Sequence, residues 1–472
     1  MTDAPEAAET VARQLAQFVA TLSLDRIPAE SIHHAKLQLL DAVGIALASS
    51  SYDFGRRAAD GLQHLSDGTA LVIGLPHRLA VRDAILVNGI LVHGLDFDDT
   101  SIHGRVHPSS FCAPPALTLA VEQGCSGRDL LTAYIAGLEC AIRIGGASKG
   151  GFPRNGFDAG GLVGHFASSL VAGRLLGLSA DELAKAQGLA LSTASGTREF
   201  IADMAWTKRM HPGWAGVGGT TAALLAKGGF RGPDLAYEGR YGLYRQFIRD
   251  GENLFDLALA TEALGDRWYV DDVAFKPVPA CFFNIAPIDA AVALAQRHDL
   301  RPADIAAVKV LVPAAAVDTV CEPKQKKRHP QDGYAGEFSI YYAVAAGLAR
   351  RDFSLADHTA EAIGDGTVRE LAQKVDYAID PQTTFPRYYS AALEVTTTDG
   401  RILQHREDIH RGAAERPIGE ADVVEKFRSN AARAVDGDRA EEIRRALMSL
   451  DTLADTRVLK GLLAPSQALA AE

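Results

Sequence analysis

Positive charges are outnumbered by negative ones in this chain of 472 residues, and this lack of basic surface narrows the functions open to it. Lysine and arginine number 48 against 59 aspartates and glutamates, which gives a formal net charge of −11, and aromatic residues make up 7%. Proteins that bind nucleic acid need a basic surface for the phosphate backbone. We therefore expect no nucleic-acid partner. The single basic run, KQKKRH at 324–329, is typical of a solvated loop.

Long hydrophobic runs and cysteine pairs are missing as well. The most apolar run, AILVNGILVHGL at 84–95, is shorter than the roughly 20 residues that cross a bilayer, and Asn88 and His93 interrupt it. The five cysteines are scattered and form no CxxC pair, which is typical of reduced thiols. The first residues, MTDAPEAAETVARQ, are acidic and do not resemble a secretory signal. We expect no membrane association and a cytoplasmic location.

Hydrophobic patterning divides the chain into three parts, and its length suggests two or three domains. Up to about residue 265 the spacing predicts helices, several of them apolar on all sides, as inside a large helical domain. From about 270 to 405 the alternation of VKVLV at 308–312 predicts a strand, and Asp399-Gly400 predicts a hairpin. Helices are expected between them, including 359–375, and again after Pro417.

The most unusual stretch is HGLDFDDTSIHGRVHPSS at 93–110, which holds three acids and three histidines. Gly104 and Pro108 disfavour a helix here, so the His-x-x-x-His spacing does not align two ligands on one helical face. A metal site, a solvated polar loop and a metal-free acid–base site are the three interpretations, and the stretch taken alone favours the polar loop. Its competent metal ligands are Asp96, Asp98, Asp99, His103 and His107.

Two lysines lie in segments that favour an anion site. TKRMHPGWAGVGG at 207–219 places Lys208 and His211 just before the expected start of a glycine-rich helix, and a helix N-terminus attracts anions. No GxxxxGK[ST] or GxGxxG motif occurs, so we expect no nucleotide phosphate. FKPVPACFF at 275–283 sets Lys276 among apolar residues, where an ammonium needs a partner unless it extends to solvent. With the acidic stretch, these lysines predict a helical enzyme with a pocket for a small carboxylate.

These segments resemble the motifs of the MmgE/PrpD family of cofactor-free lyases and isomerases, and the resemblance runs along nearly the whole chain. It implies a mainly α fold with an α+β second domain. A large all-helical domain is built from residues 1–267 and 409–472, and a smaller α+β lid from 268–408. The active site is expected in the cleft, in a homodimer without cofactor or metal. The motifs are HGLDFDDT followed by HPSS, TKRMHPG, GFRGPDLAYEGRYGLYRQF (229–247), FKPVPACFFNIAPIDAA (275–291) and GEFSIYYAVAAGL (336–348).

The family's shared chemistry makes or quenches a carbanion next to a carboxylate. Such chemistry needs a base or acid at carbon and cations that hold carboxylates and stabilise the developing charge. Carried over by position, the resemblance assigns carboxylate binding and charge stabilisation to Lys208 and Lys276. It makes His107 the proton-transfer residue, and it lets Tyr342 donate a proton or a hydrogen bond.

Four further residues receive lesser roles from the same carry-over. Asp96 is expected to orient a histidine or a lysine. Thr100 is expected to hydrogen-bond the substrate or cap a helix. His211 and His103 are weaker candidates for substrate binding, and His103 is either a supporting residue or simply exposed.

One position departs from the family pattern. NGFDAGGLVG at 155–164 has Asp158 where family members often carry a histidine. An anion repels a substrate carboxylate unless it is protonated or paired. Asp158 is therefore either the catalytic acid or base for a different substrate, or an ion-pair partner of Lys208 or Arg154. His165 either replaces the missing imidazole or is a core histidine.

These observations predict a lyase that dehydrates a small hydroxy di- or tricarboxylate, such as 2-methylcitrate, by removing a proton next to a carboxylate. An epimerase, an isomerase or a decarboxylase of a related carboxylate is the alternative. A metal-dependent hydrolase and a non-catalytic binding protein are less favoured.

Overall fold

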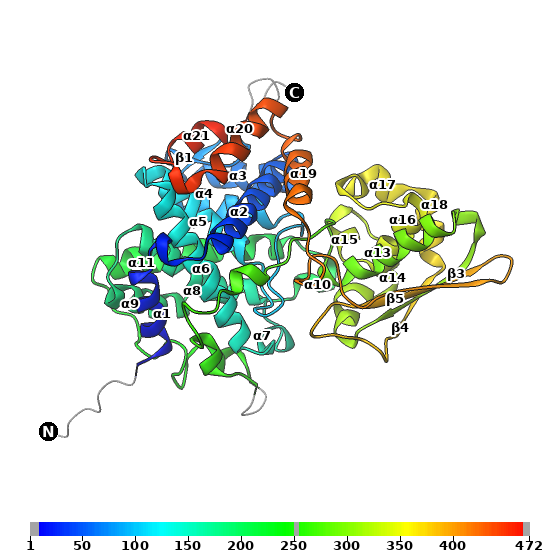
Figure 1. The fold of residues 1–472 in the computed structure, drawn as a ribbon, viewed down its shortest axis with the longest axis horizontal. Coiled ribbons are helices and arrows are strands. Elements are labelled where there is room, and N and C mark those ends of the chain that lie inside the picture. The colour runs from blue at the N-terminus through cyan, green and yellow to red at the C-terminus, as the bar shows by residue number, and fades with distance from the viewer. Residues whose placement is uncertain (1–8, 250–253, 466–472) are drawn as a thin grey trace.

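The computed structural model describes residues 9–249 and 254–465, which form a large helical domain and a smaller α+β domain side by side (Figure 1). The fold class expected from the sequence is confirmed. The described residues form two large hydrophobic cores and one small cluster between Ile45 and Leu355. Members of the first run from Val11 to Phe275 and resume at Val423, whereas those of the second lie between Ala274 and Val395. The domain boundaries at residues 267 and 408 stay predictions.

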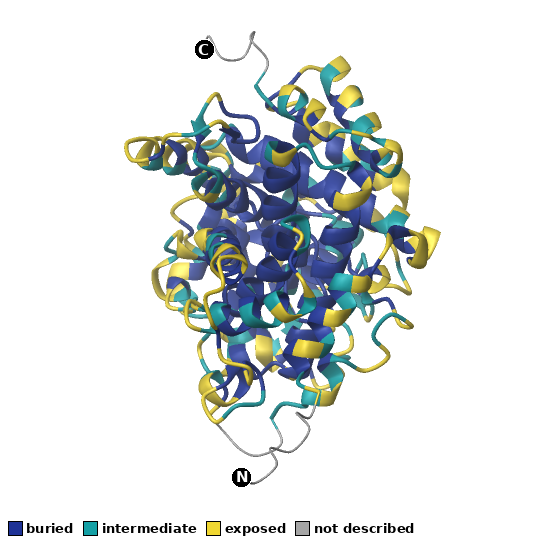
Figure 2. Cartoon of the chain, turned by 90° about the vertical axis from the view of Figure 1, so that its left-hand side faces the viewer, coloured by how far each residue is buried: buried dark blue, intermediate teal, exposed yellow. Residues whose placement is uncertain are grey.

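The large domain is a set of helices around one core, and Figure 2 shows its central helices buried along their length. It also holds a two-residue antiparallel ladder of β1 (Ala70–Leu71) with β2 (Arg78–Leu79). Its helices are α1 (Val11–Thr21), α2 (Ala29–Ser50), α3 (Asp53–Gln63), α4 (Val81–His93), α5 (Pro108–Gln123), α6 (Gly127–Ala147), α7 (Gly151–Arg154), α8 (Ala159–Leu175), α9 (Ala180–Leu191), α10 (Phe200–Asp203), α11 (Thr207–Lys227), α12 (Leu243–Phe247), α19 (Glu420–Ala431), α20 (Gly437–Met448) and α21 (Val458–Leu462).

The last helices of the described chain return to the large domain, as the family resemblance implied. Helix α19 packs along α2, and Gly44 makes room there for Phe427. A Cβ atom at Gly44 would lie only 2.9 Å from Cδ2 of Phe427, so a larger residue would push the helices apart. The first and last helices therefore share one core.

Helix α6 is the one described helix that is long and apolar enough to cross a membrane. Its apolar window lies wholly inside the molecule, against α5 and α8. This burial is typical of a core helix.

The crossing of α4 and α11 is unusually close, and it positions the site described below. A Cβ atom at Gly89 would lie 2.4 Å from the Cα atom of Gly213, and one at Gly213 would lie 2.2 Å from the carbonyl oxygen of Leu86. Only glycine permits this approach of two helix backbones. It brings His93, the last residue of α4, next to Lys208 in the first turn of α11.

The small domain is a four-stranded sheet against which α13 and α16 pack. The strand order is β4-β3-β5-β6, with β3 parallel to β4 and antiparallel to β5, and β5 antiparallel to β6. The predicted strand and hairpin are confirmed as β3 and β5–β6. The elements are α13 (Phe282–Arg297), β3 (Ile305–Val312), α14 (Lys324–Arg328), α15 (Gly333–Glu337), α16 (Ile340–Arg350), α17 (Ala360–Gly364), α18 (Gly366–Gln373), β4 (Val375–Ile379), β5 (Ala391–Thr397) and β6 (Ile402–Glu407).

The segment 359–375, predicted as one helix, is two short helices followed by a strand. The side chain of Asp365 accepts hydrogen bonds from the amides of Thr367 and Val368, and this cap starts α18 as a new helix after α17. Val375 then begins β4, which pairs with β3. The helical spacing of the sequence did not show that this cap interrupts it.

Candidate active site

The acidic loop, residues 94–107, connects α4 to α5 and contains no helix, as the sequence predicted. Thr100 forms an antiparallel bridge with Ala274, in the segment that leads into the small domain, and Pro108 begins α5. Asp96 has a φ of 44°, a left-handed conformation that a non-glycine residue keeps only where its surroundings hold it. The loop is thus fixed at the junction of the two domains.

Asp96 lies between two lysines from distant parts of the chain. Nζ of Lys208 donates to Oδ1 of Asp96 at 2.9 Å. Nζ of Lys276 donates to the same oxygen at 2.8 Å and to the Asp96 carbonyl at 2.7 Å. Each ammonium has three donors and uses two on described residues, since Lys208 also contacts His93. The buried position of Lys276 is therefore explained by Asp96 and not by contact with solvent.

These contacts set the ionisation of Asp96 and Lys208. Burial alone would raise the pKa of Asp96, but the two lysines outweigh burial and hold that pKa well below its ordinary value. Burial alone would lower the pKa of Lys208, and the carboxylate of Asp96 reverses this and raises it. Both groups are therefore charged at neutral pH.

Lys208 and His211 lie inside the first turns of α11, which begins at Thr207, whereas the sequence placed them before the helix. Pro212 lacks the amide hydrogen that a helix would offer to the Lys208 carbonyl, which made a helix through it look unfavourable. Packing against α4 and α8 stabilises the helix in spite of this loss. A spacing of three puts Lys208 and His211 on one helical face.

His93 connects Lys208 to Asp98. Its Nε2 lies 3.0 Å from Nζ of Lys208, and its Nδ1 lies 2.7 Å from Oδ2 of Asp98. Because an ammonium can only donate, His93 carries its proton on Nδ1 and donates it to Asp98. The sequence gave no reason to assign His93 a role, although it is the first residue of HGLDFDDT.

His107 is held as a neutral imidazole with one nitrogen available. Its Nδ1 lies 3.0 Å from both the Asp99 carbonyl oxygen and Oγ1 of Thr100. A carbonyl only accepts, so Nδ1 carries the proton and Nε2 keeps its lone pair. Burial, together with Lys276 and Lys208, lowers the pKa of His107 to about 3. With 23% of its side chain exposed, His107 can accept a proton from a bound molecule.

A metal site at the same place has to be weighed. Asp96, Asp98 and His107 each offer a ligand atom, and these atoms lie within 4.8 Å of one another. Yet Oδ1 of Asp96 is already shared by two ammonium groups, and a divalent cation there would be repelled by both. The donor set fits an acid–base site neutralised by lysine better than a metal site. The expected absence of a metal stays a prediction.

Asp158 caps α8 and faces His211. Its Oδ1 accepts from the amide of Gly161 at 2.9 Å and lies 3.8 Å from Nδ1 of His211. Burial alone would raise the pKa of Asp158, but His211 and Lys208 hold it below its ordinary value. Within the described residues Asp158 forms no ion pair with Lys208 or Arg154, the two partners considered from the sequence. Its nearest cationic candidate is His211 instead.

Three residues that the sequence suggested for the site make no contact with Lys208 or Lys276. His165 is fully buried with Nδ1 bonded inside its own helix, so it is a core histidine. His103 is exposed and stacks on the ring of Tyr269 at 4.3 Å between centroids. The hydroxyl of Tyr342 donates to the Asp357 carbonyl at 2.6 Å, inside the small domain. The predicted roles of His103 and Tyr342 therefore find no support in these contacts.

The small domain contributes side chains that sequence reasoning missed. The Phe338 ring centroid lies 5.4 Å from Nζ of Lys208. The Tyr334 ring faces the guanidinium of Arg209 at 4.0 Å, and its buried hydroxyl has no hydrogen-bond partner in the described part of the chain. Burial raises the pKa of Glu337 well above its ordinary value. The motif GEFSIYY indicated that this segment belongs to the site. Which side chains of the segment face the acidic loop is shown only by the way α15 packs against the large domain.

The far side of the acidic loop is fixed by a second pair of a lysine and a buried carboxylate. Nζ of Lys426, in α19, donates to Oδ2 of Asp41 at 2.9 Å and to the Phe97 carbonyl at 2.8 Å. Asp99 is held by Ser109, whose hydroxyl donates to it at 2.5 Å, and burial raises the pKa of Asp99 to about 8. Residues from both ends of the described chain therefore support the loop.

Comparison with known proteins finds matches along most of the chain. A family model described as the MmgE/PrpD N-terminal domain matches residues 13–255, and one described as the MmgE/PrpD C-terminal domain matches residues 278–452. The chain is 28% identical over 469 residues to cis-aconitate decarboxylase from Homo sapiens, covering 96% of this chain and 95% of that protein. It is 26% identical over 429 residues to 2-methylcitrate dehydratase from Salmonella typhimurium, covering 84% of this chain and 85% of that protein.

Proposed function

The chain belongs to the MmgE/PrpD family, and on that premise we propose that it is a lyase that dehydrates a small hydroxy di- or tricarboxylate without a cofactor. The observation that carries the proposal is the neutral imidazole of His107, with its Nε2 available, beside the two lysines that share Asp96. A base next to carboxylate-binding cations is what removal of a proton beside a carboxylate requires.

In the proposed reaction the substrate carboxylate binds the remaining donors of Lys208 and Lys276. Nε2 of His107 takes the proton from the neighbouring carbon, and the electron pair of that C–H bond forms the carbon–carbon double bond. The C–O bond breaks, and the hydroxyl leaves as water with a proton from His211, which faces Asp158. The charge of the enolate-like state is stabilised by the ammonium groups.

Decarboxylation is the second candidate, and the coverage of the relatives favours it. The human cis-aconitate decarboxylase aligns over 96% of the chain, against 84% for the Salmonella dehydratase. Decarboxylation needs a proton donor at carbon once carbon dioxide has left. The lowered pKa of His107 leaves it unprotonated, so it serves dehydration directly as the base, whereas decarboxylation would have to take its proton from another group such as His211. For this reason dehydration stands first.

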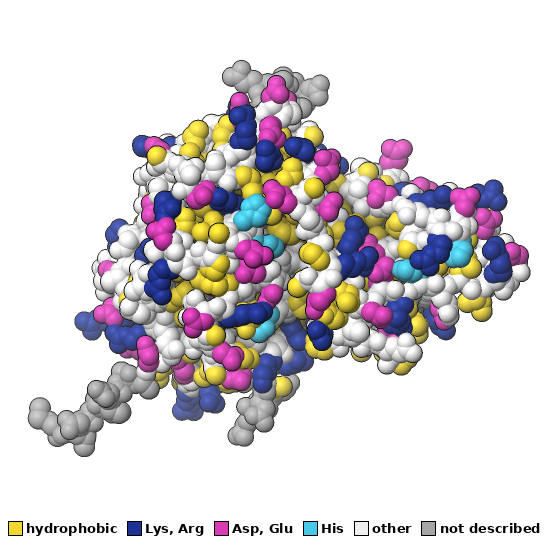
Figure 3. Space-filling view, in the orientation of Figure 1, with side chains coloured by type: hydrophobic (Ala, Val, Ile, Leu, Met, Phe, Trp, Pro, Cys, Tyr) yellow, Lys and Arg dark blue, Asp and Glu magenta, His cyan; other side chains and the backbone are white. Residues whose placement is uncertain are grey.

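We also propose a homodimer in the cytoplasm. An exposed apolar stripe runs from the residue before α11 along this helix, and we propose that a second copy of the chain covers it. On the face shown in Figure 3, acidic and basic side chains are interspersed, with no basic stripe for nucleic acid. Light scattering at micromolar concentration tests the dimer, and a monomer there would overturn it. The stripe consists of Trp206, Met210, Trp214, Leu224 and Leu225, which are 40% to 46% exposed.

The proposed activity is tested by incubating the protein in D2O with citrate, 2-methylcitrate, cis-aconitate, malate and aspartate, followed by NMR. Deuterium at a carbon next to a carboxylate is expected, with an alkene from a hydroxy acid. Loss of carbon dioxide would identify a decarboxylase, and inversion without either product an epimerase. His107→Asn, which keeps a donor near Nδ1 but removes the base, should abolish exchange. Full exchange in this variant, or no exchange with any acid in the wild type, would contradict the proposal.

A further inference from the structure

One buried lysine has no carboxylate partner. Four lysines are buried among the described residues, and three of them are ion-paired: Lys36 with Asp451, and Lys208 and Lys276 with Asp96. Lys327, at 3% exposure, has no carboxylate within ion-pairing distance in the described part of the chain. A buried ammonium without a counter-charge is costly, so its position calls for an explanation.

The amine of Lys327 reaches across the boundary between the two domains. It donates to the Thr319 carbonyl at 2.8 Å and lies 3.6 Å from the sulfur of Met204, a weak acceptor that belongs to the large domain. Its backbone is fixed as well, because the hydroxyl of Ser339 donates to the Lys327 carbonyl and also caps α16. The lysine is therefore held in place while its ammonium is only partly satisfied.

Lys327 is adjacent to the candidate active site. The Phe338 ring lies 5.8 Å from Nζ of Lys327 and 5.4 Å from Nζ of Lys208, so one aromatic ring is within cation–π range of both ammonium groups. Lys327 and Lys208 therefore share Phe338 as a neighbour.

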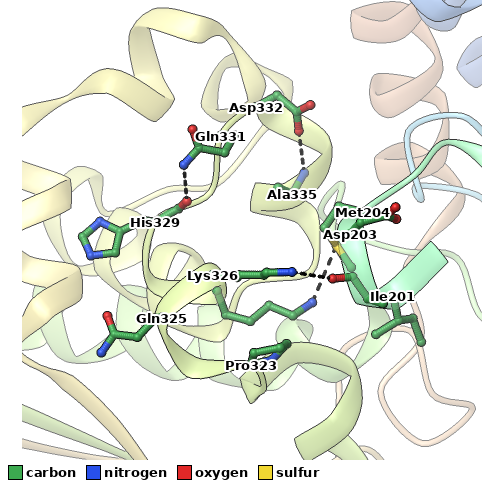
Figure 4. A pocket seen from close by; sticks show the side chains of 12 residues that line it. Ile201, Asp203, Met204, Pro323, Gln325, Lys326, His329, Gln331, Asp332 and Ala335 are labelled. Carbon is green, nitrogen blue, oxygen red and sulfur yellow. Dashed lines mark hydrogen bonds between the residues drawn. The ribbon is translucent and has the colours of Figure 1, made fainter. Parts of the chain in front are cut away.

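A cavity of about 480 Å³ opens beside Lys327, between α10 of the large domain and α14 and α15 of the small domain. Figure 4 shows Lys326, from α14, pointing toward the segment of Ile201 and Met204 across this cavity. The volume lies in the range of small-molecule sites. Met204, which lines the cavity, is the C-cap of α10 and precedes Lys208 by four residues in the chain.

The formal charges of the lysines near His107 are balanced, because Asp96 and Asp98 offset Lys208 and Lys276. The remaining donors of the two lysines bind the reacting carboxylate, and no net positive charge is left over. A substrate with two or three carboxylates needs further positive charge at its remote end.

We propose that the cavity between α10 and α14 is the subsite for a remote carboxylate of the substrate, and that Lys327 is the residue that binds it. The proposal rests on the proposed function, since it assumes that the reacting carboxylate is held at Lys208 and Lys276. The remote carboxylate replaces the weak contact of Lys327 with the Met204 sulfur. Lys327 then selects di- and tricarboxylates over acids with one carboxylate.

The test compares the wild type with Lys327→Met and with the control Lys324→Met. Lys324 lies on the same helix, but it is more exposed and pairs with Asp376 at 2.8 Å, away from the cavity. The probes are propane-1,2,3-tricarboxylate, which has no hydroxyl to eliminate, and butyrate, measured by calorimetry. We expect Lys327→Met to weaken the tricarboxylate by roughly 10- to 100-fold and to leave butyrate unchanged. The control should bind both acids like the wild type.

Equal tricarboxylate affinity in the wild type and Lys327→Met would overturn the proposal, and so would equal loss in Lys324→Met. Methionine preserves the length of the stem, and circular dichroism checks the fold of each variant. If Lys327→Met does not fold, reductive methylation of the wild type followed by mass spectrometry replaces it. Protection of Lys327 by the tricarboxylate, and not by butyrate, supports the subsite, and identical labelling contradicts it.

The two proposals fail in different ways. A wild type that binds the tricarboxylate through Lys327 but exchanges no proton in D2O would refute the proposed activity and leave the subsite standing. A wild type that turns over an acid while Lys327→Met keeps its KM would refute only the subsite.

Discussion

Asp96 and Asp41 are both buried carboxylates bound by lysine, but their pKa values are shifted in opposite directions. Burial pushes the pKa of each upward. For Asp41, which has the single lysine Lys426, the pKa stays raised. For Asp96, which has two lysines, the pKa falls well below its ordinary value. One ammonium thus does not offset burial here, whereas two do.

The two sites also differ in what surrounds them. Lys426 lies 3.8 Å from the Phe97 ring centroid and closes the far side of the loop inside one domain. The lysines of Asp96 meet at the domain junction, near His107. Asp99 is the third case: it has no lysine, and its pKa is raised to about 8. The acidic loop therefore separates a reactive end from a supporting end by the number of cations that each carboxylate receives.

The largest effect is expected at the reactive end. Lys208→Met and Lys276→Met should each lower kcat/KM by about 10³-fold, because each removes a cation that binds and stabilises the reacting carboxylate. Both variants should fold, since Asp96 keeps one lysine. Kinetics on the best substrate of the D2O panel measures the loss. Activity within a few-fold of the wild type in both variants would remove the distinction between the two ends.

The supporting end should respond in stability instead. Lys426→Met leaves Asp41 buried without a cation and should lower the free energy of unfolding by about 3 kcal/mol. Below the unfolding transition, kcat/KM should stay within roughly 5-fold of the wild type, because Lys426 does not face the substrate. Denaturant titration measures the first quantity. A loss of activity as large as that of Lys208→Met, with unchanged stability, would reverse the assignment.

A smaller effect on stability is expected from Asp99→Asn, which tests the carboxylate that has no lysine partner. Its folded pKa of about 8 lies above the unfolded value of about 3.9, so the folded state keeps a proton that the unfolded state has lost. That contribution to stability is complete below about pH 4 and is lost as the pH rises through 8. Asp99→Asn should therefore lose less stability than the wild type between pH 5.5 and pH 8.

Denaturant midpoints at the two pH values measure this difference. Glu425→Gln, an exposed change on α19, is the control and should follow the wild type. An identical fall in the wild type and Asp99→Asn would show that Asp99 is already ionised in the folded protein.

The smallest effect is expected from a chelator. Because ammonium groups occupy the oxygen of Asp96 that a metal would use, dialysis against EDTA should change the activity by less than about 2-fold. Loss of activity with EDTA, restored by a divalent metal, would replace the lysine-neutralised site by a metal site.

Local signals in the sequence foretold part of this arrangement. Gly104 and Pro108 predicted the loop, Asp399-Gly400 predicted the hairpin, and the motif positions of Lys208 and Lys276 led to the residues that share Asp96. These features depend on short-range backbone preferences or on residue chemistry, which the sequence shows directly.

The remainder depends on packing between distant segments. The start of α11 was placed too late because close contact with α4 stabilises a helix that contains Pro212. The pairing of His93 with Lys208 follows from the same contact. The side chains of α15, and Lys327 in α14, reach the large domain only through the docking of the small domain, which no local pattern encodes.

The most direct measurement is a crystal structure of the protein with propane-1,2,3-tricarboxylate. We expect one carboxylate within about 3.2 Å of the ammonium groups of Lys208 and Lys276. The neighbouring carbon should face Nε2 of His107, and a second carboxylate should lie at Lys327. A ligand bound elsewhere, or a divalent metal coordinated by Asp96, Asp98 and His107 with the lysines displaced, would contradict the assignment of this site.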